Sequence, residues 1–183
     1  MPATQAFFAD HGTQTGSPTK GTTRSAASDV NWKNSDVQAD VYSDYPVLDG
    51  ENSYPIWLFS KFTSGSFNEI SAGLFAHTAG VLGTGLTLKG TPACTGDGDR
   101  LLYVTPTTAA LAALTTDMTS VIAIGSGVAV FFGATGPEAT GKAATADGTG
   151  DKFSNYLTTQ MQTSGADAGD SEQVTLTLQY NEN

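Results

Sequence analysis

The clearest pattern of apolar and polar positions lies near the C-terminal end of the sequence. Between residues 174 and 180 every second side chain is apolar, and the side chains between them are polar. This period of two is typical of a strand with one face on a core and the other in water. A second strand is expected at 153–163, and the turn-forming segment SGADAGD separates the two. We expect either a hairpin or two strands of a Greek key.

The strongest of the other strand signals is SYPIWLFSKF, residues 53–62. One face is predicted to carry Tyr54, Ile56 and Leu58, and the other Trp57, Phe59 and Lys61. Pro55 places this segment at a sheet edge or at the start of a strand. Weaker signals predict strands at 36–43, 80–90, 100–105, 120–124 and 127–132. The segment 67–77 fits either a strand or a helical turn.

Residues 106–118, PTTAALAALTTDM, are the best helix candidate. Proline suits the first helical turn and alanine has the highest helix propensity, although the abundant threonine leaves an extended segment as the alternative. Many short strands with turn signals between them predict an all-β protein. We expect an antiparallel β-sandwich or a jelly-roll-like fold, with an extended N-terminal arm and at most one short helix.

The first 45 residues largely lack these strand patterns. In residues 1–28 the only bulky apolar side chains are Phe7 and Phe8, and the segment GTQTGSPTKGTTRSAAS has no periodicity. We therefore divide the chain into an extended arm, residues 1–45, and a β-sandwich domain, residues 46–183. Such an arm becomes ordered either by lying on a neighbouring subunit or by packing on its own domain.

Charge narrows the classes of partner. Only 14% of residues are charged, the net charge is −10, and the eight basic residues are scattered. A nucleic-acid partner is disfavoured, because phosphate binding needs a basic patch. The acidity fits either a solvated surface or docking on a basic partner. The longest apolar run, 121–132, is too short for a membrane span, which needs about 20 residues. The N-terminus has no signal-peptide pattern.

No motif in the sequence predicts catalysis or a cofactor. The segment GPEATGKA, 136–143, resembles a P-loop but has Ala143 where a magnesium-binding hydroxyl is required. The acidic turn around Asp97 and Asp99 has too few ligands for an EF-hand. His11 and His77 lack zinc-site or triad spacing. Cys94, the single cysteine, is expected to be a buried small residue or a loop thiol.

Aromatic residues cluster in one third of the chain, and such a cluster is typical of a core or a binding surface. The cluster comprises Trp32, Tyr42, Tyr45, Tyr54 and Trp57. Such residues form sugar-stacking platforms, sandwich cores or protein interfaces. We predict that partner binding uses Phe7, Phe8, Trp32, Tyr42 and Tyr45.

A series of segments after residue 50 resembles a group of small virion structural proteins of tailed bacteriophages. The segments are NSYPIWLFSKFTSGSFNEIS (52–71), GTGLTLKG (83–90), YVTP (103–106), TGPE (135–138), NYLTTQMQT (155–163) and AGDSEQVTLTLQYNEN (168–183). Each is a generic β pattern, and the likeness lies in their order. The first 45 residues have no counterpart in it.

The resemblance implies a non-enzymatic β-sandwich accessory of the virion, made in the host cytoplasm, and it supplies no catalytic residues. We expect a capsid cement or decoration protein on the outer capsid surface. Its expected partners are the major capsid protein and sister copies of itself, as a homo-oligomeric dimer or trimer. A tail, neck or fibre component is one alternative. A carbohydrate-binding adhesin module is the other.

Overall fold

The computed structural model describes residues 4–10, 24–26, 30–35, 40–63, 72–94, 114, 116–131, 152–154, 156–166 and 173–180. Within these ranges the chain forms strands and no helix, which confirms the all-β prediction. The strands are β1 (Thr4–Asp10), β2 (Arg24–Ala26), β3 (Ile56–Thr63), β4 (Ala72–Ala79), β5 (Leu86–Cys94), β6 (Thr116–Asp117), β7 (Val128–Phe131), β8 (Lys152–Phe153), β9 (Tyr156–Thr163) and β10 (Thr175–Tyr180).

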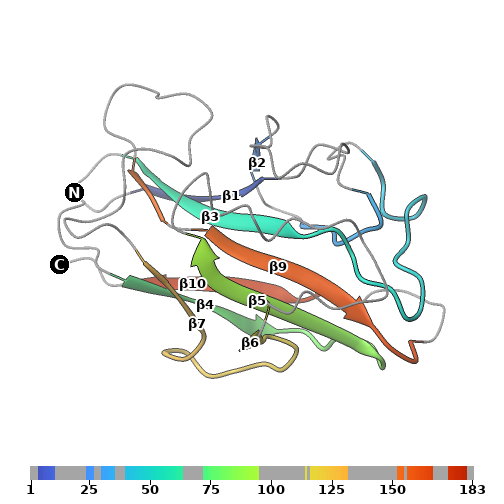
Figure 1. Ribbon diagram of the computed structural model, residues 1–183. Coiled ribbons are helices and arrows are strands. Elements are labelled where there is room, and N and C mark those ends of the chain that lie inside the picture. Colours follow the sequence, from blue (N-terminus) through green and yellow to red (C-terminus); the bar gives the residue numbers. More distant parts are fainter. Residues whose placement is uncertain are drawn as a thin grey trace.

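The strands form two antiparallel sheets (Figure 1). The large sheet has the order β2-β1-β3-β9-β5-β6, and β8 also pairs with β3. The small sheet has the order β10-β4-β7 and lies below the large one in the view of Figure 1. The middle of the large sheet therefore joins segments that are far apart in the chain, since β3 and β9 are neighbours.

Side chains from both sheets meet in one hydrophobic core. The large sheet contributes Ala9, Ile56, Leu58, Phe62, Leu88, Leu157 and Met161, and the small sheet contributes Phe75, Val128 and Leu178. Two ring pairs cross between the sheets, Phe7 with Phe75 and Phe62 with Tyr180. The predicted faces of β3 are confirmed: Ile56 and Leu58 join this core, whereas Trp57 and Phe59 are buried outside it.

The predicted C-terminal strand is confirmed as β10, and its alternation has the expected meaning. Leu178 is buried in the core, Leu176 and Tyr180 pack against it, and Thr175 is exposed. The hairpin alternative is wrong, because β9 belongs to the large sheet and β10 to the small one. After β9 the chain changes sheets, and β10 pairs with β4 instead.

The first strand lies inside the large sheet. β1 pairs with β3 along its whole length, from Thr4 opposite Thr63 to Asp10 opposite Trp57. An arm spanning residues 1–45 therefore does not describe residues 4–10, which share main-chain hydrogen bonds and core contacts with the domain. The physical reason is that β3 presents unpaired N–H and C=O groups on this side, and β1 satisfies them.

Several weaker predictions are corrected. Residues 120–124 form an exposed segment and no strand, whereas 128–131 form β7 as expected. The helix predicted at 106–118 is contradicted at its C-terminal end, where Thr116–Asp117 is the short strand β6, and residues 106–113 and 115 lie outside the described residues. Residues 40–43 are turn rather than strand, and β5 begins only at Leu86. The segment that fitted strand or helix contains the strand β4. The expected strand at 100–105 lies outside the described residues.

Candidate functional site

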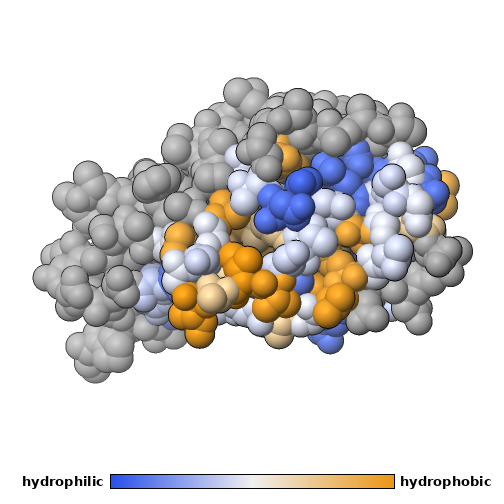
Figure 2. Space-filling view, turned by 90° about the horizontal axis from the view of Figure 1, so that it is seen from below, coloured by the Kyte–Doolittle hydropathy of each residue, from blue (hydrophilic) through white to orange (hydrophobic). Residues whose placement is uncertain are grey.

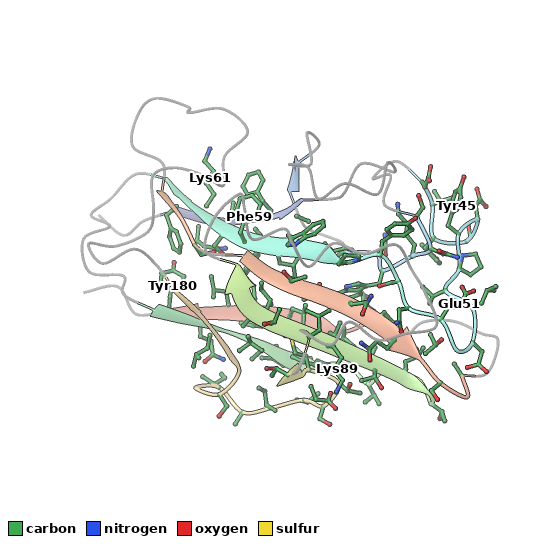
Figure 3. The ribbon with its side chains drawn as sticks, in the orientation of Figure 1. Tyr45, Glu51, Phe59, Lys61, Lys89 and Tyr180 are labelled. Carbon is green, nitrogen blue, oxygen red and sulfur yellow. The ribbon has the colours of Figure 1, made fainter. Side chains whose placement is uncertain are left out.

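One end of the molecule presents a loop with exposed apolar and aromatic side chains. We call this loop, residues 40–51, the tip; Tyr45 and Glu51 mark it in Figure 3. Tyr42 is 57% exposed and Tyr45 41%, and Val41 and Leu48 are more than half exposed as well. Exposing four such side chains together is unfavourable in water unless a partner covers them, so the tip is a candidate binding surface.

Hydrogen bonds to the preceding segment fix the first half of the tip. Asn34 N donates to Tyr45 O at 2.8 Å, and Tyr45 N donates to Tyr42 O at 3.2 Å. The buried Lys33 donates from Nζ to the carbonyl oxygen of Asp40. These bonds hold the backbone that carries Tyr42 and Tyr45 in one conformation.

Thr163, at the end of β9, anchors the second half of the tip. Its Oγ1 lies 2.7 Å from Leu48 O and 2.9 Å from Glu51 O, and it accepts a hydrogen bond from Glu51 N. Thr163 N also donates to Glu51 O at 3.0 Å. Beyond β9, Ala166 N donates to the Asp49 carboxylate at 3.0 Å. The first half of the tip is thus held by residues 33–34, and the second half is held by the end of β9.

The tip is acidic. Asp40, Asp44, Asp49 and Glu51 lie within it, and it contains no lysine or arginine. The nearby Lys33 is buried and directed at a backbone carbonyl, so its ammonium group is not displayed at the surface. Carboxylates beside exposed tyrosine rings suit a partner that offers lysine or arginine side chains, through ion pairing and cation–π contacts.

Only two of the five predicted partner-binding residues reach the tip surface. Tyr42 and Tyr45 do. Trp32 is half-buried against the core and donates from Nε1 to Thr159 Oγ1 at 3.1 Å. The ring centroid of Phe7 lies 5.9 Å from that of Phe75, and the ring of Phe8 stacks on Phe59 at 5.7 Å. These three side chains serve the domain's own packing.

The proposed sugar platform of five aromatic residues does not form as a single surface. Trp57 is 1% exposed and lies in the middle of the large sheet, so it cannot stack on a ligand in this fold. The sequence prediction also missed Val41 and Leu48, which accompany the two tyrosines on the tip. A short apolar residue within a turn-rich segment gives no periodic signal, although the turn formers Asp49-Gly50 marked the loop itself.

His77 is held by the backbone rather than displayed for chemistry. It is 1% exposed, Nδ1 lies 3.1 Å from Met118 O, and Nε2 lies 2.9 Å from Ala79 O. The side chain borders a cavity of about 150 Å³ that Phe75, Asp117, Met118 and Ile122 also line. These contacts fix the segment after β6 against β4, which is a structural role.

Asp117 lies at the rim of the same cavity, on β6. The pKa of its carboxyl is lowered by the hydrogen bond from the Thr119 side chain and then by the Thr119 backbone N–H at 2.8 Å and the Lys89 ammonium at 3.4 Å. Partial burial raises the pKa and is second in size only to the Thr119 side-chain hydrogen bond, but the net shift is downward. The carboxylate therefore serves to cap the turn after β6.

For a metal site or a membrane span, only the residues that the structure describes can be searched. Among them no three His, Cys, Asp or Glu side chains gather as a metal site, and no helix that could span a membrane occurs. The acidic turn at Asp97 and Asp99, the P-loop-like segment 136–143 and His11 lie outside those residues. Cys94 ends β5, where it pairs with Tyr156 of β9.

No protein-family model, curated protein or solved structure matches this chain. Function is therefore inferred from the geometry of the tip and from the sequence.

Proposed function

We propose that this chain is a non-enzymatic structural protein of a bacteriophage virion. In this proposal it is a capsid decoration protein that docks on the outer shell through its tip. The observation that carries the docking is the exposure of Tyr42 and Tyr45 on a loop fixed at both ends. The virion assignment is supported by the resemblance of the segments beginning with 52–71 to such proteins.

A fixed loop with exposed rings is suited to binding for an entropic reason. Ordering a flexible loop on binding costs free energy, whereas the hydrogen bonds from Asn34 and Thr163 have already ordered this backbone. Tyrosine adds a large contact area with few rotatable bonds, and tyrosines are frequent hot spots of interfaces. The carboxylates around them would steer the protein toward a basic patch.

Shell stabilisation follows from binding to the assembled state. A protein that binds the major capsid protein only in the assembled shell shifts the equilibrium toward that shell by mass action. Contacts that bridge adjacent capsid subunits or sister copies would provide this selectivity, because the bridged site exists only after assembly.

The test uses purified capsids that lack the protein and compares three proteins. Tyr42→Ala combined with Tyr45→Ala should weaken shell binding by about 30-fold or more, which corresponds to about 2 kcal/mol. Thr84→Ala is the control, since it shortens an exposed side chain outside both the tip and the small sheet and should leave binding within about twofold. Co-sedimentation measures occupancy, and calorimetry measures the capsid melting temperature.

The outcomes separate the two parts of the proposal. If the unmodified protein does not co-sediment with any capsid, the virion assignment is wrong. If it binds and the double variant binds equally well, the tip is not the docking surface. Imaging of labelled particles distinguishes a decoration protein, which covers the shell, from a tail or neck component, which marks one vertex.

The second candidate function is carbohydrate binding, and the exposure of both Tyr42 and Tyr45 favours it. Two tyrosine rings fixed on one loop provide the aromatic faces on which sugar rings stack. A glycan array with the unmodified protein and Tyr42→Ala decides this. Signals that the substitution removes would support an adhesin module, and signals no higher than background would reject it.

A further inference from the structure

A second surface of the molecule has no charged side chain among its own described residues. Beside it lies the ion pair of Lys89 with Asp117, at 3.4 Å, and Asp117 borders the cavity that Phe75 and Ile122 also line. The surface comprises the small sheet and the segment that crosses it, in the described ranges 72–81, 118–131 and 173–180. These ranges contain no Asp, Glu, Lys or Arg, in a chain whose net charge is −10. His77 lies among them, but its ring is buried. We call this surface the uncharged face.

The crossing segment, residues 119–127, is held against the small sheet by backbone contacts. Ile122 N donates to His77 O of β4 at 3.0 Å, and Gly125 N donates to the Gln179 side chain of β10 at 2.6 Å. Gly127 lies directly on the backbone of Phe75. The segment therefore has a defined position from which its apolar side chains project outward.

The apolar side chains of the uncharged face are strongly exposed. Ile124 is 85% exposed and Val81 71%, and Val121 and Ile122 are exposed as well. Figure 2 shows the molecule from below, with hydrophobic residues gathered on this side. Covering aliphatic side chains at this degree of exposure with a partner is favourable, because it removes apolar surface from water.

We infer that the uncharged face is the interface between two copies of this chain. Two copies with a net charge of −10 each repel one another, and the repulsion is weakest where the facing surfaces carry no charge. The cores of homodimer interfaces are apolar and poor in charged residues, as this face is. A two-fold axis would place the patch around Ile124 on the same patch of the second copy.

Charge also argues against the other occupants of this face. A basic partner finds four carboxylates on the tip, whereas the single described carboxylate beside this face, Asp117, is already paired with Lys89. An anionic lipid surface would need lysine or arginine side chains, which this face also lacks. The inference uses no premise of the capsid proposal and holds whether or not that proposal is correct.

The experiment compares self-association of the full chain and its variants by sedimentation equilibrium over a wide concentration range. The unmodified protein should dimerise with a dissociation constant of about 10 μM or tighter. Ile124→Asp should weaken dimerisation by about 30-fold or more, because it places a charge at the centre of an apolar interface. Leu48→Asp, on the tip, adds the same charge at an exposed aliphatic residue and should change the constant less than about threefold.

A lysine variant separates the effect of substituting position 124 on dimerisation from the effect of changing the net charge. Ile124→Lys adds one positive charge and so reduces the net negative charge of each copy from −10. General repulsion would fall, yet this variant should weaken dimerisation as strongly as Ile124→Asp. Ile124 is so exposed that neither variant should change the thermal unfolding of the monomer. Hydrogen exchange provides a readout without substitution: residues 119–127 should gain protection as the concentration of the unmodified protein rises.

Three results would overturn the inference. The first is a protein that stays monomeric at its highest soluble concentration. If that monomer binds detergent micelles, the face is a docking surface for another apolar partner. The second is an equal increase of the dimer dissociation constant in Ile124→Asp and Leu48→Asp, which would show that net charge alone controls the association. The third is concentration-dependent association with no change of exchange in residues 119–127.

Discussion

The ring of Tyr180 meets the ring of Phe62 edge to face, with centroids 5.0 Å apart and planes at 86°. Phe62 belongs to β3 of the large sheet and Tyr180 to β10 of the small sheet, so this pair joins the two sheets. Edge-to-face pairs contribute about 0.5–1.5 kcal/mol beyond the burial of their area. The pair therefore links the last described strand to the strand at the middle of the fold.

The first prediction concerns this pair. Phe62→Ala should lower the free energy of unfolding by about 3–5 kcal/mol, because the side chain is fully buried. Tyr180→Ala should cost less, since its ring is only half-buried. In urea unfolding the double variant should show a coupling of about 0.5–1.5 kcal/mol. Strict additivity of the two costs would show that the rings do not interact in solution.

The second prediction compares two glycines of the crossing segment. Gly127 has φ of +145°, and an added Cβ would lie 2.3 Å from Phe75 O. Gly127→Ala should therefore lower the free energy of unfolding by about 2–4 kcal/mol. Gly125 also has positive φ, +93°, but open space around it. Gly125→Ala should cost about 1–2 kcal/mol, the backbone strain alone. Equal losses in thermal unfolding would argue against the close approach to β4.

The third prediction concerns the anchor of the tip. Thr163→Val keeps the shape of the side chain and removes the hydroxyl that contacts Leu48 O and Glu51 O. The free energy of unfolding should fall by about 1–3 kcal/mol, and amide exchange at residues 48–51 should quicken. Thr175→Val, at an exposed site on β10, is the matched control and should change stability by less than about 0.5 kcal/mol.

The fourth prediction follows from the lowered pKa of Asp117. Because the folded state holds the carboxylate with a pKa below the ordinary 3.8, the charge stabilises the fold at neutral pH. That contribution is lost as the pH falls through the folded pKa. Asp117→Asn should therefore be less stable than the unmodified protein at pH 7, and this difference should vanish in the acid range below 3.8.

The magnitude of this effect is small, because Asp117 is 59% exposed and its pair with Lys89 is screened by salt. Exposed pairs of this kind contribute about 0.2–1 kcal/mol. Urea unfolding from pH 7 to pH 2, at low and high salt, provides the measurement. Asp44→Asn, at an exposed site on the tip, serves as the control, and a stability difference at Asp117 that does not change with pH would contradict the prediction.

Strand identity was predictable where one side of a segment meets the core. The alternation around Leu178 and the two faces of β3 followed directly from the period of two. Pairing was not predictable, because the pattern of β10 is the same whether its neighbour is β9 or β4. The change of sheets after β9 depends on long-range contacts that no local pattern records.

Burial was misjudged from the sequence in both directions, because apolar composition alone does not say which side chains a fold covers. The run of apolar residues at 120–124 was predicted to be a buried strand, yet Ile124 is largely exposed. Phe7 and Phe8 were predicted to be partner contacts, yet they pack on opposite faces of a strand within the large sheet. At the tip, Tyr42 and Tyr45 were identified by residue type. The support of their loop by Asn34 and by Thr163 of β9 comes from outside the loop and has no signal in the tip's own sequence.

The pairing of β3 with β9 has a consequence for how the chain acquires its structure. Ile56 and Thr159 are neighbours in the large sheet although 103 positions separate them. During synthesis, β3 can pair with β1 early, but its other side stays unpaired until β9 has left the ribosome. Domains dominated by such distant pairings fold in about milliseconds to seconds, slowly for their size. In that interval the apolar segment IWLF of β3 has an open edge, and this is the stage at which the nascent protein is most prone to aggregate.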